Sequence, residues 1–284
     1  MSVSLEAPAR RITGPAALSG DWRRFLNLTM TLALTDWKLR FFGSVLGYAW
    51  SLLRPLLLFG VLYVVFSLIV RIGDTVERYP IVLLVGIVLF MYFAEVTSGC
   101  VTSVVDRESL VRKVSFPRMV VPLAVAVSSS FNLGLNLVAV AVFVAASGVQ
   151  PRLSWLLLPL PILALIVLAT GVGMLLAALY VSFRDIGPIW EVIAQTLFYA
   201  SPVFFPIEFV LKFSEDFGRG AMANPLAPII TESRHLLLGD GVLSASQAAG
   251  GRAMLLIPLA VLVSLTVLGF WIFNRNAPRV AEAL

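Results

Sequence analysis

The chain has 284 residues, of which 59% are hydrophobic and only 13% are charged, with a formal net charge of +5. Its mean hydropathy of +0.95 excludes an ordinary soluble surface, because soluble domains average about 25% charged residues. The single cysteine, Cys100, and the single histidine, His235, exclude a disulfide framework, a Cys/His metal cluster and a Ser-His triad.

The N-terminal forty residues precede the first apolar run. Residues 1–20 lack the apolar core of a signal peptide and are expected to form a disordered cytoplasmic tail. Residues 21–42 alternate basic and apolar side chains at helical spacing, with tryptophans at Trp22 and Trp37. This composition favours an amphipathic helix in the cytoplasmic membrane interface over a plain cytosolic helix packed on a partner.

Most of the remaining chain consists of apolar stretches of membrane-spanning length. A helix needs about 20 apolar residues to cross the ~30 Å hydrocarbon layer. Because lipid offers backbone amides no partner, these stretches must be helices, and the class is an all-α polytopic membrane protein. We expect six spans, at roughly residues 48–70, 81–105, 119–147, 153–181, 189–210 and 254–273.

The basic residues predict the orientation. With six spans, fourteen Lys and Arg fall on the side of the two termini and seven on the opposite side. The positive-inside rule therefore places both ends, including the tail at 275–284, in the cytoplasm. Contact with anionic headgroups explains the net charge, which gives no reason to invoke nucleic acid.

The loop at about 106–118 combines charges of both signs with Leu110, Val111, Val114 and Phe116. A short amphipathic helix ended by Pro117 is plausible, and an exposed apolar face in a charged loop usually marks a protein contact. No phosphate-binding loop of the G-x-x-x-x-G-K-[ST] type occurs, because no lysine follows a glycine. If the protein uses ATP, another chain binds it.

Polar residues fall at helical spacing within two consecutive spans. Glu95, Ser98 and Thr102 share one face of the second span, and Ser128, Asn132 and Asn136 share one face of the third. Two such stripes suit a hydrated substrate path, and they equally suit interhelical hydrogen bonding. For Glu95 both readings stay open, since a carboxylate in the membrane must be paired or wet.

Aromatic residues concentrate in the fifth span and its exit, including Phe198, Tyr199, Phe204 and Phe205. They form either an interfacial aromatic belt or a surface on which sugar rings stack. The long connection that follows, about 207–251, is punctuated by Pro and Gly but too apolar for disorder. We expect it to form short or re-entrant helices on the extracytoplasmic side.

Several motifs, in order along residues 36–274, resemble those of type-2 ABC permeases that export bacterial polysaccharides. The resemblance rests on K-L-R-F at 38–41, S-V-L-G-Y-A-W at 44–50, K-V-S-F-P at 113–117, R-D at 184–185, the Q-to-P segment at 195–206, and N-P at 224–225 followed by Arg234.

The resemblance implies a transmembrane domain at 43–274 in a homodimer paired with two copies of a separate ATPase. This chain would bind no cofactor itself, and ATP and Mg²⁺ would sit on that partner. The substrate would be a lipid-linked glycan of the O-antigen, teichoic acid or capsule type, moved across the bacterial cytoplasmic (inner) membrane.

The resemblance also implies roles for particular residues. Coupling to the ATPase would involve Asp106, Leu110, Val111, Arg112, Lys113, Phe116, Pro117, Arg184 and Asp185. The substrate path would involve Glu95, Ser98, Thr102, Asn132, Asn136, Phe198, Tyr199, Phe204 and Phe205. Lipid access at the interface would involve Trp22, Trp37, Lys38, Arg40, Trp50 and Arg54.

Two other functions remain open. One is export of a small lipid or drug by the same fold, which an enclosed apolar cavity would favour. The other is a membrane enzyme or assembly subunit acting on a polyprenyl carrier. That function would need convergent acid and base residues, and Glu95 and Glu191 lie toward opposite ends of their spans.

Overall fold

The computed structural model describes residues 22–40, 42–71, 76, 78–107 and 117–283. Every regular element in these residues is a helix, which confirms the predicted all-α class. Five helical segments are long and apolar enough to cross a membrane: Ala49–Ile69, Tyr79–Asp106, Val120–Ala146, Leu153–Ser182 and Arg252–Asn276.

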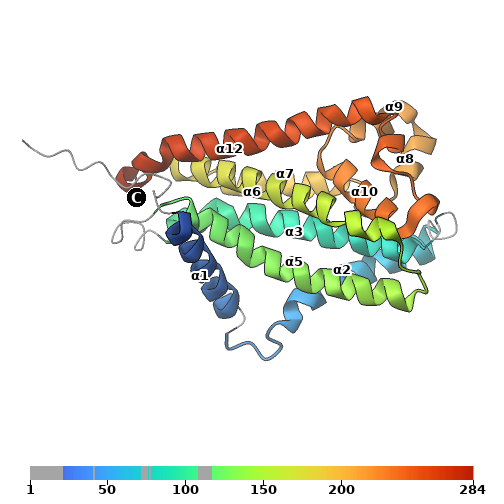
Figure 1. Ribbon diagram of the computed structural model, residues 1–284, viewed down its shortest axis with the longest axis horizontal. Helices are drawn as coiled ribbons and strands as arrows, with labels where there is room; N and C mark the ends of the chain where they lie inside the picture. The colour runs from blue at the N-terminus through green and yellow to red at the C-terminus, as the bar shows by residue number, and fades with distance from the viewer. Residues whose placement is uncertain (1–21, 41, 72–75, 77, 108–116, 284) are drawn as a thin grey trace, which may run out of the picture.

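These spans correspond to successive labelled helices (Figure 1). α2 (Ala49–Tyr63) continues into a π-helical segment, Val64–Ile69. α3 is Tyr79–Asp106, α5 is Val120–Ala146, and α6 (Pro159–Ser182) follows a 3₁₀ turn at Leu153–Leu157. α12 (Leu256–Ala283) follows another such turn at Arg252–Leu255.

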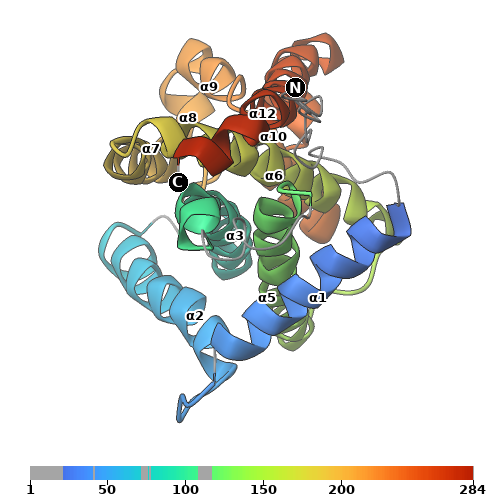
Figure 2. The same ribbon diagram turned by 90° about the vertical axis from the view of Figure 1, so that its left-hand side faces the viewer.

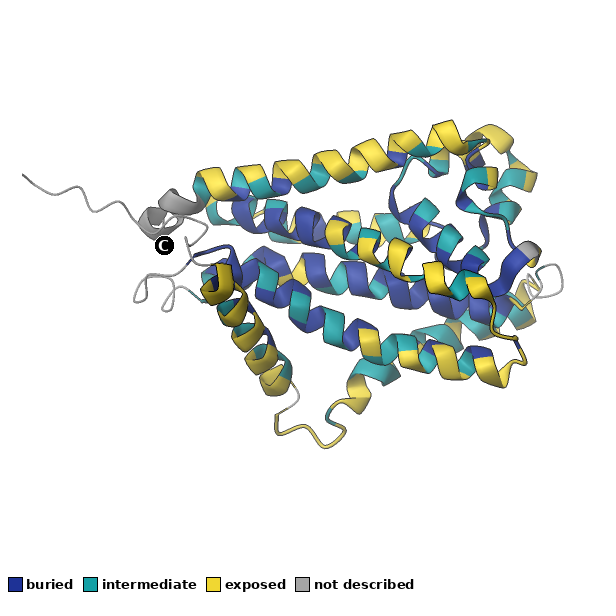
Figure 3. Ribbon diagram, viewed as in Figure 1, coloured by how far each residue is buried: buried dark blue, intermediate teal, exposed yellow. Residues whose placement is uncertain are grey.

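α3 is the central helix of the bundle. It packs against α5 and α6, and α12 packs along the outer side of α6 (Figure 2). Within their most apolar windows 78% of α3 residues are buried but only 6% of those in the α2 span, although both are strongly apolar (Figure 3). Hydropathy therefore finds both spans but does not distinguish a helix surrounded by protein from one exposed on the bundle surface.

α1 (Trp22–Arg40) lies obliquely across one end of the bundle, the same end at which α12 finishes (Figures 1 and 2). Phe25, Thr29 and Ala33, spaced by four residues, form its buried face and pack toward α5. The adjoining face exposes Trp22, Leu26, Met30 and Leu34. The amphipathic helix expected at 21–42 is thus present as a helix with two distinct faces, and its immersion in lipid stays a prediction.

The segment predicted as the fifth span is not one long helix. α7 (Ile186–Ala200) ends after 15 residues, and α8 (Ile207–Phe213) begins after a non-helical stretch that starts at Ser201. Pro202 and Pro206 lack the N–H groups that a continuing helix requires. Neither half qualifies alone as a candidate span, so the six-span count remains a prediction.

Arg234 occupies the space behind this break. It lies on α10 (Leu226–Leu238), is only 1% exposed, and donates from Nε to the carbonyl of Val82 at 2.8 Å. Its Nη1 and Nη2 atoms donate at 2.6 Å to Pro202 and Val203, with a longer contact of 3.5 Å to Phe205. Burial lowers the pKa of Arg234 to about 10, so the guanidinium stays charged at neutral pH. The carbonyls that the broken helix releases are thereby hydrogen-bonded.

Gly86 allows this arrangement, because a Cβ atom there would collide with the Val203 carbonyl and with Arg234. The remaining short helices, α9 (Glu215–Ala221) and α11 (Ala245–Ala248), join α8 in a small separate core built on Ile207 and Met222. The connection at 207–251 thus consists of short helical pieces, as predicted.

Candidate functional site

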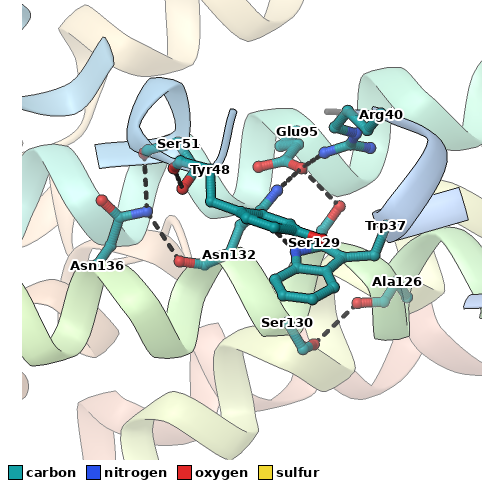
Figure 4. Close-up of polar contacts among 10 residues, drawn as sticks. All are labelled: Trp37, Arg40, Tyr48, Ser51, Glu95, Ala126, Ser129, Ser130, Asn132 and Asn136. Atoms are coloured by element: carbon teal, nitrogen blue, oxygen red, sulfur yellow. Dashed lines mark hydrogen bonds and ion pairs between the residues drawn. The ribbon is translucent and has the colours of Figure 1, made fainter. Parts of the chain in front are cut away.

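A polar pocket of about 720 Å³ opens between the end of α1, the start of α2, and the middle of α3 and α5. Its wall contains seven of the residues predicted for the substrate path or for lipid access: Arg40, Trp50, Arg54, Glu95, Ser98, Asn132 and Asn136. An eighth, Trp37, lies behind the wall and contacts Asn132. The two predicted groups, drawn from different parts of the sequence, therefore meet in one place (Figure 4).

Glu95 is the centre of the pocket's hydrogen bonds. Its Oε1 atom accepts from Asn132 Nδ2 at 2.8 Å and from Ser129 Oγ at 3.1 Å, and it pairs with Arg40 Nη1. The carboxylate is thus paired and hydrogen-bonded, with its side chain 32% exposed. These contacts agree with interhelical hydrogen bonding, and a part for Glu95 in a substrate path stays a prediction.

Asn132 connects Glu95 to α1. Its Oδ1 atom accepts a hydrogen bond from Trp37 Nε1 at 3.0 Å while its Nδ2 atom donates to Glu95 (Figure 4). This relay fixes which way the amide points, because indole can only donate. The Trp37 ring stacks on Tyr48 at 4.5 Å between centroids and meets Phe131 edge-on at 5.7 Å.

α1 has a second ionic attachment, independent of the pocket. Asp36 pairs with Arg107, which directly follows α3, and both side chains are largely shielded from solvent. Neither residue carries a sequence signal for this contact, since they are 71 positions apart and each stands among other charges. Ser129 was likewise missed, because it lies one residue from the predicted polar stripe of the third span.

The remaining pocket residues complete a polar wall. Asn136 Nδ2 donates to the carbonyls of Ser51, at 3.2 Å, and of Asn132, at 2.8 Å. Arg54 projects from the exposed side of α2, and no ion pair of Arg54 occurs within the described residues. The wall therefore holds two cations and one anion, which makes the pocket net positive.

Several predicted residues lie away from this pocket. Thr102 donates to Asp106 at 2.7 Å, two turns along α3 from Glu95. Trp22 and Lys38 are exposed on α1. Trp22 stacks on Phe25 at 5.5 Å, toward the other end of that helix.

The predicted aromatics form a separate cluster near the far end of α3. Phe198 and Phe204 lie 5.9 Å apart, and Phe204 meets Phe205 at 4.8 Å and Phe66 at 5.0 Å. The Phe204 carbonyl accepts from Tyr79, about 24 Å along α3 from Glu95. The cluster is partly buried, whereas Tyr199 is exposed. A path shared by the aromatics and the polar stripes stays a prediction.

The predicted coupling residues are only partly described. Leu110, Val111, Arg112, Lys113 and Phe116 lie outside the described residues. Asp106 is exposed at the end of α3, Pro117 is buried, and Arg184 and Asp185 are exposed in the turn between α6 and α7. The Arg184 guanidinium lies 5.3 Å from the Tyr180 ring centroid.

A helical bundle with five candidate spans and a pocket lined by polar residues of those helices fits a membrane transport protein. The chain belongs to the ABC-2 type transporter family, whose family model matches residues 27–238 and so includes the whole pocket and the Arg234 contacts. As a member of this family, the chain is a transport component and not an enzyme.

Individual relatives cover nearly the whole chain. An O-antigen export system permease protein, RfbA, of Klebsiella pneumoniae is 28% identical over 91% of this chain and 95% of its own length. One of the same name from Myxococcus xanthus is 26% identical over 92% of this chain and 96% of its own length. The polysialic acid transport protein KpsM of Escherichia coli is 23% identical over 73% of this chain and 80% of its own length.

Proposed function

We propose that the chain is the permease of an exporter that moves a lipid-linked polysaccharide of the O-antigen type across the bacterial inner membrane. The observation that carries the proposal is the match of O-antigen export permeases along 91–92% of this chain. The pocket supports it, because hydroxyl-rich sugars need amide, hydroxyl and aromatic partners, which Asn132, Asn136, Ser98 and Trp50 supply.

In this proposal two copies of the chain form the pathway and two copies of a separate ATPase drive it. The loop at 106–118 and the turn at Arg184 and Asp185 contact that ATPase, and the end of the bundle carrying α1 faces the cytoplasm. A lipid-linked glycan reaches the pocket past α1, where Arg40 and Arg54 meet its anionic linkage.

The test is a deletion of the gene followed by measurement of surface polysaccharide. Loss of long-chain surface glycan, with lipid-linked glycan accumulating inside the cell, is the expected result. Complementation with wild type should restore export, whereas Leu110→Asp/Val111→Asp/Phe116→Asp should insert in the membrane, fail to co-purify with the ATPase and fail to restore export. Unchanged surface glycan in the deletion strain would contradict the proposal.

Orientation has its own test in a Cys100→Ala background. An impermeant thiol reagent should label Ser214→Cys in intact cells and leave Ser4→Cys unlabelled. The reverse pattern would overturn the predicted orientation and, with it, the proposed direction of transport.

Export of a small lipid or drug is the second candidate. An apolar groove of about 470 Å³ between α6, α7 and α12, lined by residues such as Leu176, Trp190 and Leu265, is the observation that favours it. Replacing Leu176 by Asn should then impair transport more than replacing Asn132 by Leu. The polysaccharide proposal predicts the opposite ranking.

A further inference from the structure

Three charged side chains line the polar pocket, and their balance is uneven. Glu95 is the acidic member, and it pairs with Arg40. Arg54 lines the same space from α2 without an ion pair to any described residue. The pocket therefore holds one neutralised cation and one cation available to a ligand.

The Arg40–Glu95 pair is open to exchange. Its side chains are 39% and 32% exposed and line the pocket, so a ligand that enters the pocket can reach both. Arg40 is the last residue of α1, so its side chain can move without bending the helix. α1 itself stays attached through the Asp36–Arg107 pair and through Trp37, neither of which needs Arg40.

Glu95 does not depend on Arg40 for its hydrogen bonds. When Arg40 leaves, Asn132 and Ser129 still donate to Oε1, and Trp37 still holds the Asn132 amide in the orientation that makes this bond. Removing one partner of a buried pair normally strands the other charge at a high cost. Here the carboxylate keeps two donors and is already 32% exposed, so separation costs less.

We propose that Glu95 is an internal counter-ion that occupies Arg40 in the resting pocket and yields it to a phosphate-type anionic headgroup held jointly by Arg40 and Arg54. A phosphate carries more charge than a carboxylate and accepts the guanidinium fork in a bidentate manner, so it outcompetes Glu95. The inference rests on the proposed function and adds to it a regulatory residue for the same pocket.

The test is a double-mutant cycle on binding, with the full permease and its ATPase in zwitterionic nanodiscs. Farnesyl diphosphate is the lipid-bound anion, inorganic pyrophosphate the free anion, and farnesol the uncharged lipid. Removing the competitor in Glu95→Gln should tighten farnesyl diphosphate binding by up to about fivefold. Arg40→Gln should weaken it about tenfold. Adding Glu95→Gln to Arg40→Gln should then change nothing, because the counter-ion has no cation left to occupy.

Glu191→Gln is the matched control, because Glu191 is an exposed carboxylate on α7 outside the pocket wall. It should leave the affinity unchanged, and all variants should be monodisperse with melting temperatures near wild type. Binding of pyrophosphate as tight as that of farnesyl diphosphate would assign the subsite to a free anion, and binding of farnesyl diphosphate alone would assign it to a lipid headgroup. Either result supports exchange at Arg40.

Three results would overturn the inference. They are unchanged or weaker binding in Glu95→Gln, equal tightening by Glu95→Gln with and without Arg40, and no binding of either anion by wild type. Each leaves the proposed function standing if deletion of the gene still abolishes surface glycan. Intact surface glycan in the deletion strain would instead sink the proposed function, whatever the affinities are.

Discussion

Arg234 and Glu95 are two charged side chains inside the same bundle, and they are accommodated in opposite ways. Arg234 is fully buried and donates to four backbone carbonyls from two separate segments. Its guanidinium therefore cannot move away without breaking the fold. Glu95 is partly exposed and accepts from three side chains on α1 and α5, of which Arg40 is exposed and can move away while Asn132 and Ser129 are buried and stay in place. A charged group that is hydrogen-bonded to the backbone fixes the architecture, whereas a charged group that is hydrogen-bonded to side chains leaves room for a ligand.

The largest expected effect comes from removing the buried guanidinium. Arg234→Met removes the side-chain donor from the carbonyls of Pro202, Val203 and Phe205 in the non-helical stretch, each at about 1–3 kcal/mol, against a typical total stability of about 5–15 kcal/mol. We expect little folded permease in the membrane, measured by fluorescence-detected size exclusion. Arg219→Met, which removes an exposed cation on α9, should melt like wild type. A normal melting temperature for Arg234→Met would contradict the structural role of Arg234.

A smaller loss should follow from crowding the same place. Gly86→Ala puts a methyl group against the Val203 carbonyl and Arg234, at a cost of roughly 1–3 kcal/mol. Gly134→Ala is the matched control, because a Cβ there meets nothing within 4 Å. Thermal melting of the purified variants should separate them by several degrees, and equal melting would mean that the Arg234 contacts relax easily.

Substitutions in the pocket should lower stability less than those at Arg234 and Gly86, and they should still affect transport. Trp37→Phe keeps the ring stacked on Tyr48 but loses the hydrogen bond to Asn132, worth about 1 kcal/mol. We expect a slightly lower melting temperature and reduced surface glycan at equal membrane levels. Trp271→Phe, at an exposed position on α12, should export normally. Full export by Trp37→Phe would show that the relay is not needed.

The smallest change in stability is expected for Glu95→Gln. Its ion pair is exposed, so the loss should stay below about 1 kcal/mol, and the new amide oxygen can still accept from Asn132 and Ser129. Surface glycan should nevertheless change relative to wild type at matched expression. A large drop in melting temperature would place Glu95 in the same structural class as Arg234 and remove the contrast.

Periodicity and hydropathy were sufficient to predict the all-helical class, five of the spans and the helix faces that carry Glu95, Asn132 and Asn136. Each of these features depends on a pattern within a single helix. Pro202 and Pro206 mark the break after Ala200 in the sequence, but periodicity and hydropathy could not show that its carbonyls are bound by Arg234, from a helix more than 30 residues later. Nor could they join Arg40 to Glu95, since a pairing across 55 residues depends on the angle at which α1 crosses α5.

The short α7 also has a consequence for the surrounding lipid. At 1.5 Å per residue its 15 residues extend only about 22 Å, less than the ~30 Å hydrocarbon layer, and its side chains Ile189, Val192 and Ile193 are exposed. If α7 lies in the bilayer, as the six-span prediction requires, this hydrophobic mismatch would be relieved by local thinning of the bilayer or by sinking of α8 and its neighbours into it. We expect the membrane to be thinnest along α7, where a polar chain has the shortest distance to cross.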